Sequence, residues 1–187
     1  MKRRQSGFTL IELLIVVAII GILSSLLLPN IQVAIQKSKQ KTCMSDIMFI
    51  ATGCADYIVD HGSWGTIEQN GPLSNSGAFV DALYTFRLRQ FPINDPWGNP
   101  FSAYVGAAAV ASSVSGIPAG DCGEDDFLIR SFGRDHEPGP LHTTFNPGDL
   151  EAGIYGVTTV ADFDEDLVNW SGSWIIAPRV AKKESET

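Results

Sequence analysis

Apolar side chains fill the first part of this chain almost without interruption. Between Phe8 and Leu28 the run FTLIELLIVVAIIGILSSLLL contains a single charged residue, Glu12. About 20 consecutive apolar residues span the hydrocarbon core of a bilayer, so this run predicts a transmembrane helix. Pro29 follows directly, where it removes one backbone hydrogen bond and is expected to kink a helix that continues.

Beyond Pro29 the pattern becomes amphipathic. Apolar residues recur at helical spacing among Gln, Lys, Ser and Asp, at Ile31, Ala34, Ile35, Met44, Ile47, Met48, Ala51, Ala55 and Ile58. This spacing predicts one helix from Phe8 to about Asp60, roughly 80 Å long at 1.5 Å per residue. Residues 8–29 are expected in the membrane, and residues 30–60 are expected to pack on a globular domain formed by residues 61–187.

The globular domain reads as short elements separated by Gly, Pro and Asn. A short helix is expected at 78–91, and strands at 101–105, 126–132, 153–160 and 173–178. Residues 107–116 and 137–148 read as surface loops. One long helix packed on a small antiparallel sheet is an α+β fold.

Charge is distributed unevenly along the chain. Residues 1–41 contain six Lys or Arg and one Glu, a net charge of +5, whereas the rest contains 7 basic and 20 acidic residues, a net charge of −13. An acidic domain argues against nucleic acid as a partner, since that binding neutralises phosphates with Lys and Arg. Lys2, Arg3 and Arg4 instead predict a cytoplasmic N-terminus and a domain across the membrane. A cleaved secretory signal is the alternative, but its apolar region would be shorter than this one.

The residues around Glu12 provide a more specific signal. After a short basic leader, the chain has Gly7 followed by Phe8-Thr9-Leu10-Ile11-Glu12. This order resembles the signature of type IV prepilins and type II secretion pseudopilins. The resemblance implies a pilin fold and removal of leader 1–7 by a prepilin peptidase, which cuts after Gly7 and N-methylates Phe8. It also implies that Glu12, a costly residue at membrane depth, pairs with the N-terminal ammonium of a neighbouring subunit. The alternative is a glutamate whose side chain reaches back to the lipid headgroups.

A second motif lies in the domain. The segment DPWGNPF begins with Asp95, Pro96, Trp97 and Gly98 and ends at Phe101. It combines turn-forming residues with a large aromatic side chain. It resembles a motif of the major (G-type) pseudopilin family of type II secretion systems. SFGRD at 131–135 and the acidic residues 162–166 before a Trp match later parts of that family's pattern, although residues 136–161 are longer than expected.

The acidic residues raise the question of a metal. Calcium prefers six to eight hard oxygens, and residues 162–166 contain four acids. An EF-hand does not fit, because Leu167 and Ser173 occupy its Gly and Glu positions. The family resemblance implies a structural calcium site, with Asp135, Asp162, Asp164 and Asp166 as ligands and the Phe132 carbonyl as a further one. The alternative is a solvated acidic loop.

The remaining reactive side chains show no catalytic pattern. His61, His136 and His142 lack metal-ligand spacing, and no GxSxG, P-loop or GxGxxG occurs, so no catalytic residues and no enzyme activity are expected. Cys43 and Cys54 lie about 16 Å apart on one helix, too far for a disulfide. Either could reach Cys122; we retain Cys54–Cys122 as the candidate pair, beside free buried thiols.

These observations predict a structural pseudopilin of the inner membrane that forms a fibre driving export of folded proteins. Its expected partners are other copies of itself, minor pseudopilins, the inner-membrane assembly platform and the prepilin peptidase. Two alternatives remain: a type IV pilin for adhesion, motility or DNA uptake, and a membrane-tethered periplasmic enzyme or calcium-binding module.

Overall fold

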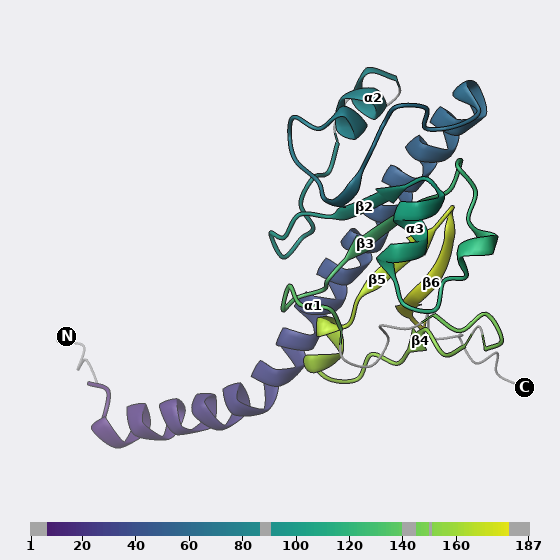
Figure 1. The fold of residues 1–187 in the computed structure, drawn as a ribbon. Coiled ribbons are helices and arrows are strands. Elements are labelled where there is room, and N and C mark those ends of the chain that lie inside the picture. The colour runs from purple at the N-terminus through teal and green to yellow at the C-terminus, as the bar shows by residue number, and fades with distance from the viewer. Residues whose placement is uncertain (1–6, 87–90, 140–144, 150, 180–187) are drawn as a thin grey trace, which may run out of the picture.

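A long helix projecting from a small α+β domain defines the fold (Figure 1). The computed structural model describes residues 7–86, 91–139, 145–149 and 151–179. Helix α1 (Leu10–His61) has 52 residues, which confirms the predicted continuous helix. It ends at Gly62, whose φ of 81° gives the left-handed C-cap that glycine adopts without steric cost. The helix changes direction between its projecting and its packed part (Figure 1).

A six-stranded sheet of order β1-β2-β3-β5-β6-β4 forms the body of the domain. Neighbouring strands are antiparallel except β4, which pairs parallel to β6. The strands are β1 (Asn70–Pro72), β2 (Ser102–Val105), β3 (Phe127–Ser131), β4 (Ile154–Tyr155), β5 (Leu167–Trp170) and β6 (Ser173–Pro178). The shorter helical elements are α2 (Ala78–Phe86), α3 (Ala107–Ser113), η1 (Ala119–Asp121) and η2 (Ala161–Asp164).

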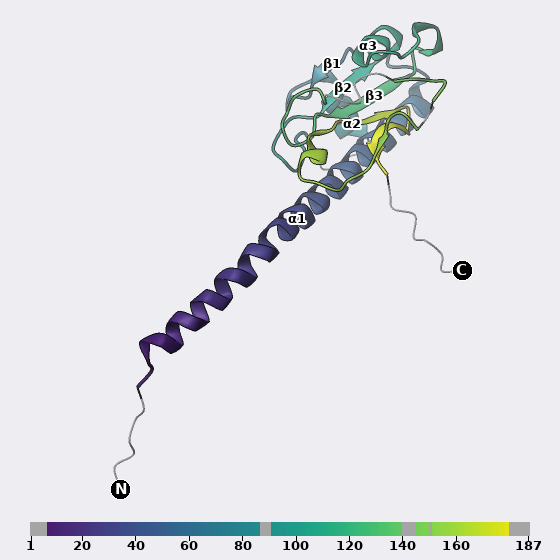
Figure 2. The same ribbon diagram turned by 90° about the horizontal axis from the view of Figure 1, so that it is seen from below.

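Helices cover the centre of the sheet on both sides. Figures 1 and 2 show α1 against one face and α3 against the other. All five residues of β3 are therefore buried, including Arg130 and Ser131. A strand covered on both faces loses the alternation of apolar and polar residues, so the run FLIRS has no period of two.

Several element predictions need correction. Residues 107–113 form helix α3 instead of a surface loop, because Val110 packs into the core and Ala favours a helix. The strand expected at 153–160 is only the two residues of β4, and β1 and β5 were not predicted. The helix expected at 78–91 is described as far as Phe86, and residues 87–90 lie outside the described part.

The packed part of α1 buries one stripe, which overlaps the predicted positions at Ile47 and Ala51. Its buried side chains are Gln40, Cys43, Ile47, Ile50, Ala51 and Cys54, whose spacing follows one stripe of the helix. Ile31, Ile35 and Phe49 are 45–52% exposed, so apolar side chains lie on both sides of this helix. One stripe therefore serves the core of the domain and the other faces away from it.

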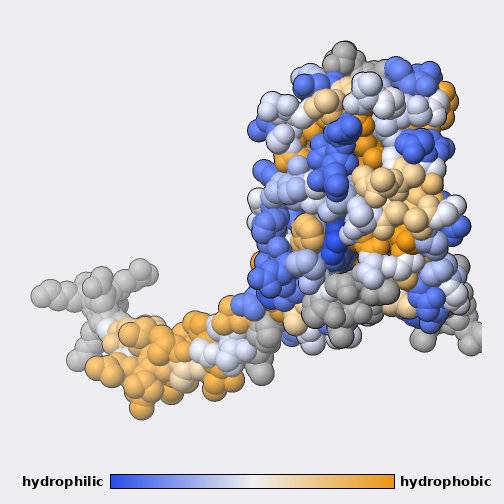
Figure 3. Space-filling view, viewed as in Figure 1, coloured by the Kyte–Doolittle hydropathy of each residue, from blue (hydrophilic) through white to orange (hydrophobic). Residues whose placement is uncertain are grey.

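The projecting part of α1 has no protein around it. Every side chain described between Gly7 and Leu28 is exposed, and this segment is predominantly hydrophobic in Figure 3. Residues 30–61 are also long and apolar enough to cross a membrane, but a third of that apolar stretch is buried within the domain. The N-terminal segment, whose apolar surface no described residue of the domain covers, therefore suits the predicted transmembrane helix better.

Candidate assembly site and interlocked loops

The start of α1 holds Glu12 in a capping box. Thr9 donates from its backbone N–H (2.9 Å) and its hydroxyl (2.7 Å) to Glu12 Oε2, and its hydroxyl accepts from the Glu12 N–H (3.3 Å). This arrangement satisfies free donors at a helix N-terminus, where a negative charge is also favoured. Both bonds to the carboxylate use the same oxygen, which leaves the second oxygen for a partner. Phe8, the predicted new N-terminus, is 76% exposed beside it.

The DPWGNP segment forms a turn around a buried carboxylate. Asp95 is 5% exposed, and its Oδ1 accepts from the N–H groups of Trp97 (3.0 Å) and Asn99 (2.9 Å). The backbone closes the turn with bonds from Asp95 N to Asn99 O and from Gly98 N to Asp95 O. Gly98 has a φ of 100°, a conformation that L side chains rarely adopt. The motif thus encodes a fixed turn with Asp95 at its centre.

This turn locks onto the SFGRD segment, 36 residues away along the chain. The Ser131 hydroxyl donates to Asp95 Oδ2 (2.9 Å), and the Asn99 amide donates to the Gly133 carbonyl (3.2 Å). The Trp97 indole donates to Gln36 Oε1 of α1 (2.7 Å). The two motifs noted in the sequence therefore form one structural unit that braces the helix. Sequence reasoning identified both motifs but not their contact.

The four predicted calcium ligands do not converge on one point. Asp162 lies in η2, and Asp166 directly precedes β5. Residues 162–166 are therefore not one extended strand, in which alternate carboxylates would point to the same side. Asp135 lies in the turn after β3, where its carboxylate accepts from the Glu137 N–H (3.1 Å). Among the described residues, no group of three or more metal-ligating side chains lies together.

Three of the four acids of this segment have separate partners. Asp162 Oδ2 accepts from the N–H groups of Thr159 and Thr158, both at 2.6 Å, and these bonds hold the pKa of its carboxyl below the usual value. Asp164 binds Arg134 and Asp166 binds Arg130. Burial raises the pKa of Asp166, and the adjacent Arg130 guanidinium opposes that shift.

As placed, these carboxylates do not fit a calcium site. Asp162 accepts from backbone N–H groups, and Asp164 and Asp166 bind two guanidinium groups, which would repel a divalent cation. Calcium binding therefore stays a prediction from the family resemblance.

The predicted disulfide between Cys54 and Cys122 is wrong. All three cysteines are free. Cys54 is fully buried on α1, whereas Cys122 is half-buried after η1 and its thiol contacts the Pro118 carbonyl (3.5 Å). The two thiols therefore belong to separate environments.

Free cysteines of unequal burial give a direct check of the core. We expect a maleimide to label Cys122 in the folded protein, and Cys43 and Cys54 only after denaturation. The reason is burial, which excludes the reagent from the two α1 thiols and raises their pKa, so that little thiolate forms. Mass spectrometry of the labelled protein with and without denaturant measures this; labelling of Cys54 at the rate of Cys122 would contradict the packing.

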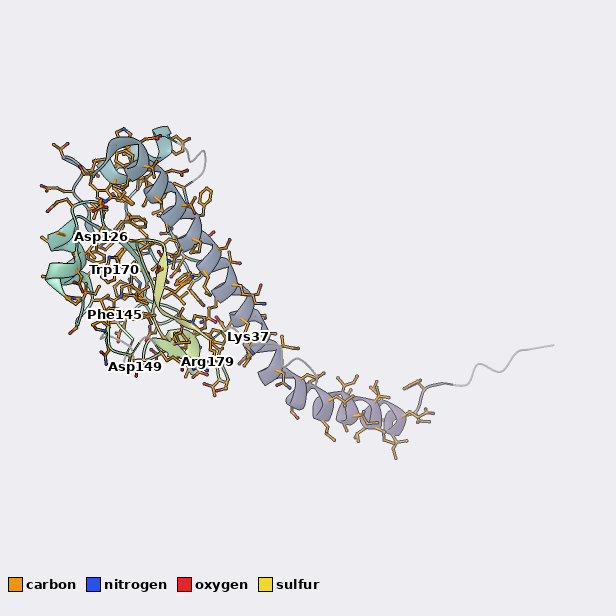
Figure 4. All side chains as sticks on the ribbon, turned by 90° about the vertical axis from the view of Figure 1, so that its right-hand side faces the viewer. Lys37, Asp126, Phe145, Asp149, Trp170 and Arg179 are labelled. Carbon is orange, nitrogen blue, oxygen red and sulfur yellow. The ribbon has the colours of Figure 1, made fainter. Side chains whose placement is uncertain are left out.

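The aromatic side chains around the sheet pack on one another. Phe145 and Trp170 meet edge to face with ring centroids 5.9 Å apart, and Figure 4 shows them on the side of the domain away from α1.

Lys37 and Arg179 lie at the end where the helix leaves the domain (Figure 4), and both line one hollow with Lys41. Basic side chains thus gather at the end of the domain from which the apolar part of α1 projects.

Comparison with known proteins first defines the class. Residues 2–28 match the family described as the prokaryotic N-terminal methylation motif, so the N-terminus is of the processed pilin type. The capping box and the exposed apolar helix lie within this matched segment.

Relatives of the whole chain then define the family. The chain is 39% identical to the type II secretion system core protein G of Aeromonas hydrophila over 108 residues, 54% of this chain and 73% of that protein. It is 33% identical to the protein of the same name from Dickeya chrysanthemi over 176 residues, 91% and 90% of the two chains. The Escherichia coli K12 protein is 28% identical over 133 residues, 68% and 91%. No solved structure matches the chain. The chain belongs to the type II secretion system core protein G family and is a pseudopilin.

Proposed function

We propose that this pseudopilin is the repeating subunit of a filament that grows from the inner membrane and drives folded proteins across the outer membrane. The observation that carries the proposal is helix α1, with an uncovered apolar first part and a second part packed on a domain. A helix of this kind can leave the bilayer only if other apolar surfaces replace the lipid. Identical helices in a bundle would supply them.

Processing prepares the subunit for this step. Lys2, Arg3 and Arg4 keep the N-terminus in the cytoplasm, where the prepilin peptidase cuts after Gly7 and methylates Phe8. The remaining chain keeps the capping box, since Thr9 and Glu12 both lie after the cut. The second oxygen of Glu12 then accepts a hydrogen bond from the N-terminal ammonium of Phe8 in a neighbouring subunit. This ion pair sets the register between subunits.

Contacts between copies continue above the membrane. Ile31, Ile35 and Phe49 form an exposed apolar stripe on α1, which we name the outer stripe. An apolar stripe facing away from the domain suits packing against the helix of a neighbouring copy. The orientation places the domain in the periplasm, where minor pseudopilins and the assembly platform would meet the filament.

The experiment that tests this function is a clean gene deletion, scored for secreted proteins and surface filaments in the same strain. We expect secreted proteins to disappear from the medium while type IV pili remain, and plasmid-borne wild type to restore secretion. Loss of pili with an unchanged set of secreted proteins would instead make the chain a type IV pilin.

A further inference from the structure

We propose that Arg130 and Arg134 take the place of a bound cation in the acidic segment, residues 162–166. The domain then reaches full stability without calcium. The inference concerns the C-terminal domain and does not rest on the secretion function. It starts from the observation that two arginines from one region of the chain each bind one acid of a segment about 30 residues away.

The first contact fastens the outer side of the acidic segment. Arg134 donates from Nε to Asp164 Oδ1 (2.7 Å) and from Nη2 to Asp164 Oδ2 (2.8 Å), a two-bonded geometry specific to guanidinium and carboxylate. The Arg134 backbone N–H also donates to the Phe163 carbonyl (2.9 Å). One residue therefore binds the segment through both its side chain and its backbone.

Gly133 brings the two backbones close enough for this contact. A Cβ at Gly133 would lie 2.8 Å from the carbonyl oxygens of both Phe163 and Glu165, and its φ is +73°. Only glycine avoids both the clash and the strain. The turn after β3 is thus shaped to lie directly against the acidic segment.

The second contact lies in the core. Asp166 is fully buried and accepts from Arg130 Nε (3.1 Å) and Nη2 (2.5 Å). The remaining groups of the pair are also engaged: Arg130 Nη1 donates to the Ser113 carbonyl of α3 (3.1 Å), and Asp166 Oδ1 accepts from the Gly139 N–H (3.2 Å). The guanidinium carbon stands 4.5 Å from the centre of the Phe132 ring. A buried pair with such additional bonds joins β3, α3 and the loop before β4.

Together these contacts do what a bound cation would do. A divalent ion in an acidic loop cancels negative charge and ties distant segments together. Here two guanidinium groups cancel the charges of Asp164 and Asp166, and backbone N–H groups of Thr158 and Thr159 satisfy Asp162. A cation would have to displace Arg134 to reach Asp164. The arginines therefore replace the metal instead of adding to it.

The test compares thermal unfolding of the full-length protein in detergent with excess EGTA and with millimolar CaCl2, followed by circular dichroism. We expect the same Tm for wild type in both buffers. Arg134→Gln should lower the Tm by several degrees in EGTA, because it removes both side-chain bonds to Asp164. Arg179→Gln is the matched control: it removes a single bond, to Glu151 (3.1 Å), in a pair more exposed than Arg134–Asp164, so no shift is expected.

Two results would overturn the proposal. One is a wild-type Tm that rises in CaCl2 and falls in EGTA, with the rise lost in Asp164→Ala, which would establish the calcium site. The other is an Arg134→Gln protein as stable as wild type in EGTA, which would show that this arginine does not hold the segment.

Discussion

Replacing Asp95 by alanine is expected to lower the free energy of unfolding by about 3–5 kcal/mol. The change leaves several hydrogen-bond donors without an acceptor at a largely buried site, and each such group costs about 1–3 kcal/mol. The donors are the N–H groups of Trp97 and Asn99 and the hydroxyl of Ser131. The change also removes the link between the DPWGNP turn and the end of β3. Urea unfolding of the detergent-solubilised protein, followed by circular dichroism, measures the loss.

Asp149→Ala is the matched control for this experiment. The Asp149 carboxylate accepts a similar bond, from the Glu151 N–H (3.1 Å), but it is exposed, so water can replace it. We expect a loss of about 0.5 kcal/mol or less for this surface change. An Asp95→Ala protein no less stable than Asp149→Ala would contradict the bracing role of the turn.

Filament assembly should be lost in Glu12→Val while cleavage after Gly7 continues. Valine suits the bilayer, so the subunit still inserts, but the Phe8 ammonium of a neighbour then enters an apolar bundle without a counter-ion. Mass spectrometry of the mature chain reports cleavage and methylation. Immunoblotting of sheared filaments, together with an assay of secreted proteins, reports assembly.

Glu12→Gln separates the two roles of this side chain. Glutamine can still accept from Thr9 as the capping box requires, but it carries no charge. We expect Glu12→Gln to assemble poorly as well, because the ion pair and not the cap joins the subunits. Normal filaments from Glu12→Gln would assign the role of Glu12 to the cap, and normal filaments from Glu12→Val would exclude both roles.

Local patterns accounted for much of this fold. A long apolar run followed by helical spacing predicted α1 to within two residues at its start and one at its end. Turn-forming residues identified the DPWGNP turn, whose geometry depends on neighbours four positions apart at most. The strand predicted at 126–132 is confirmed as β3, although burial on both faces removes its alternation. The prediction failed at α3, where a run of small residues carries no amphipathic pattern.

The acidic segment shows where local reasoning stops. The pattern DFDED suggested a calcium site, which needs several carboxylates at one point. The chain instead forms η2 and then enters β5, so the carboxylates diverge towards different partners. Their partners Arg130 and Arg134 lie 36 and 30 positions away along the chain. No spacing rule in the sequence links them.

By itself, the sequence determined the N-terminal apolar helix, the methylation motif and the turn, since composition and neighbouring residues specify all three. Only the tertiary structure decided which stripe of α1 is buried, which acids meet arginines and that Asp95 meets Ser131. These depend on how the sheet pairs its strands, and strand pairing brings together residues that are far apart in the chain.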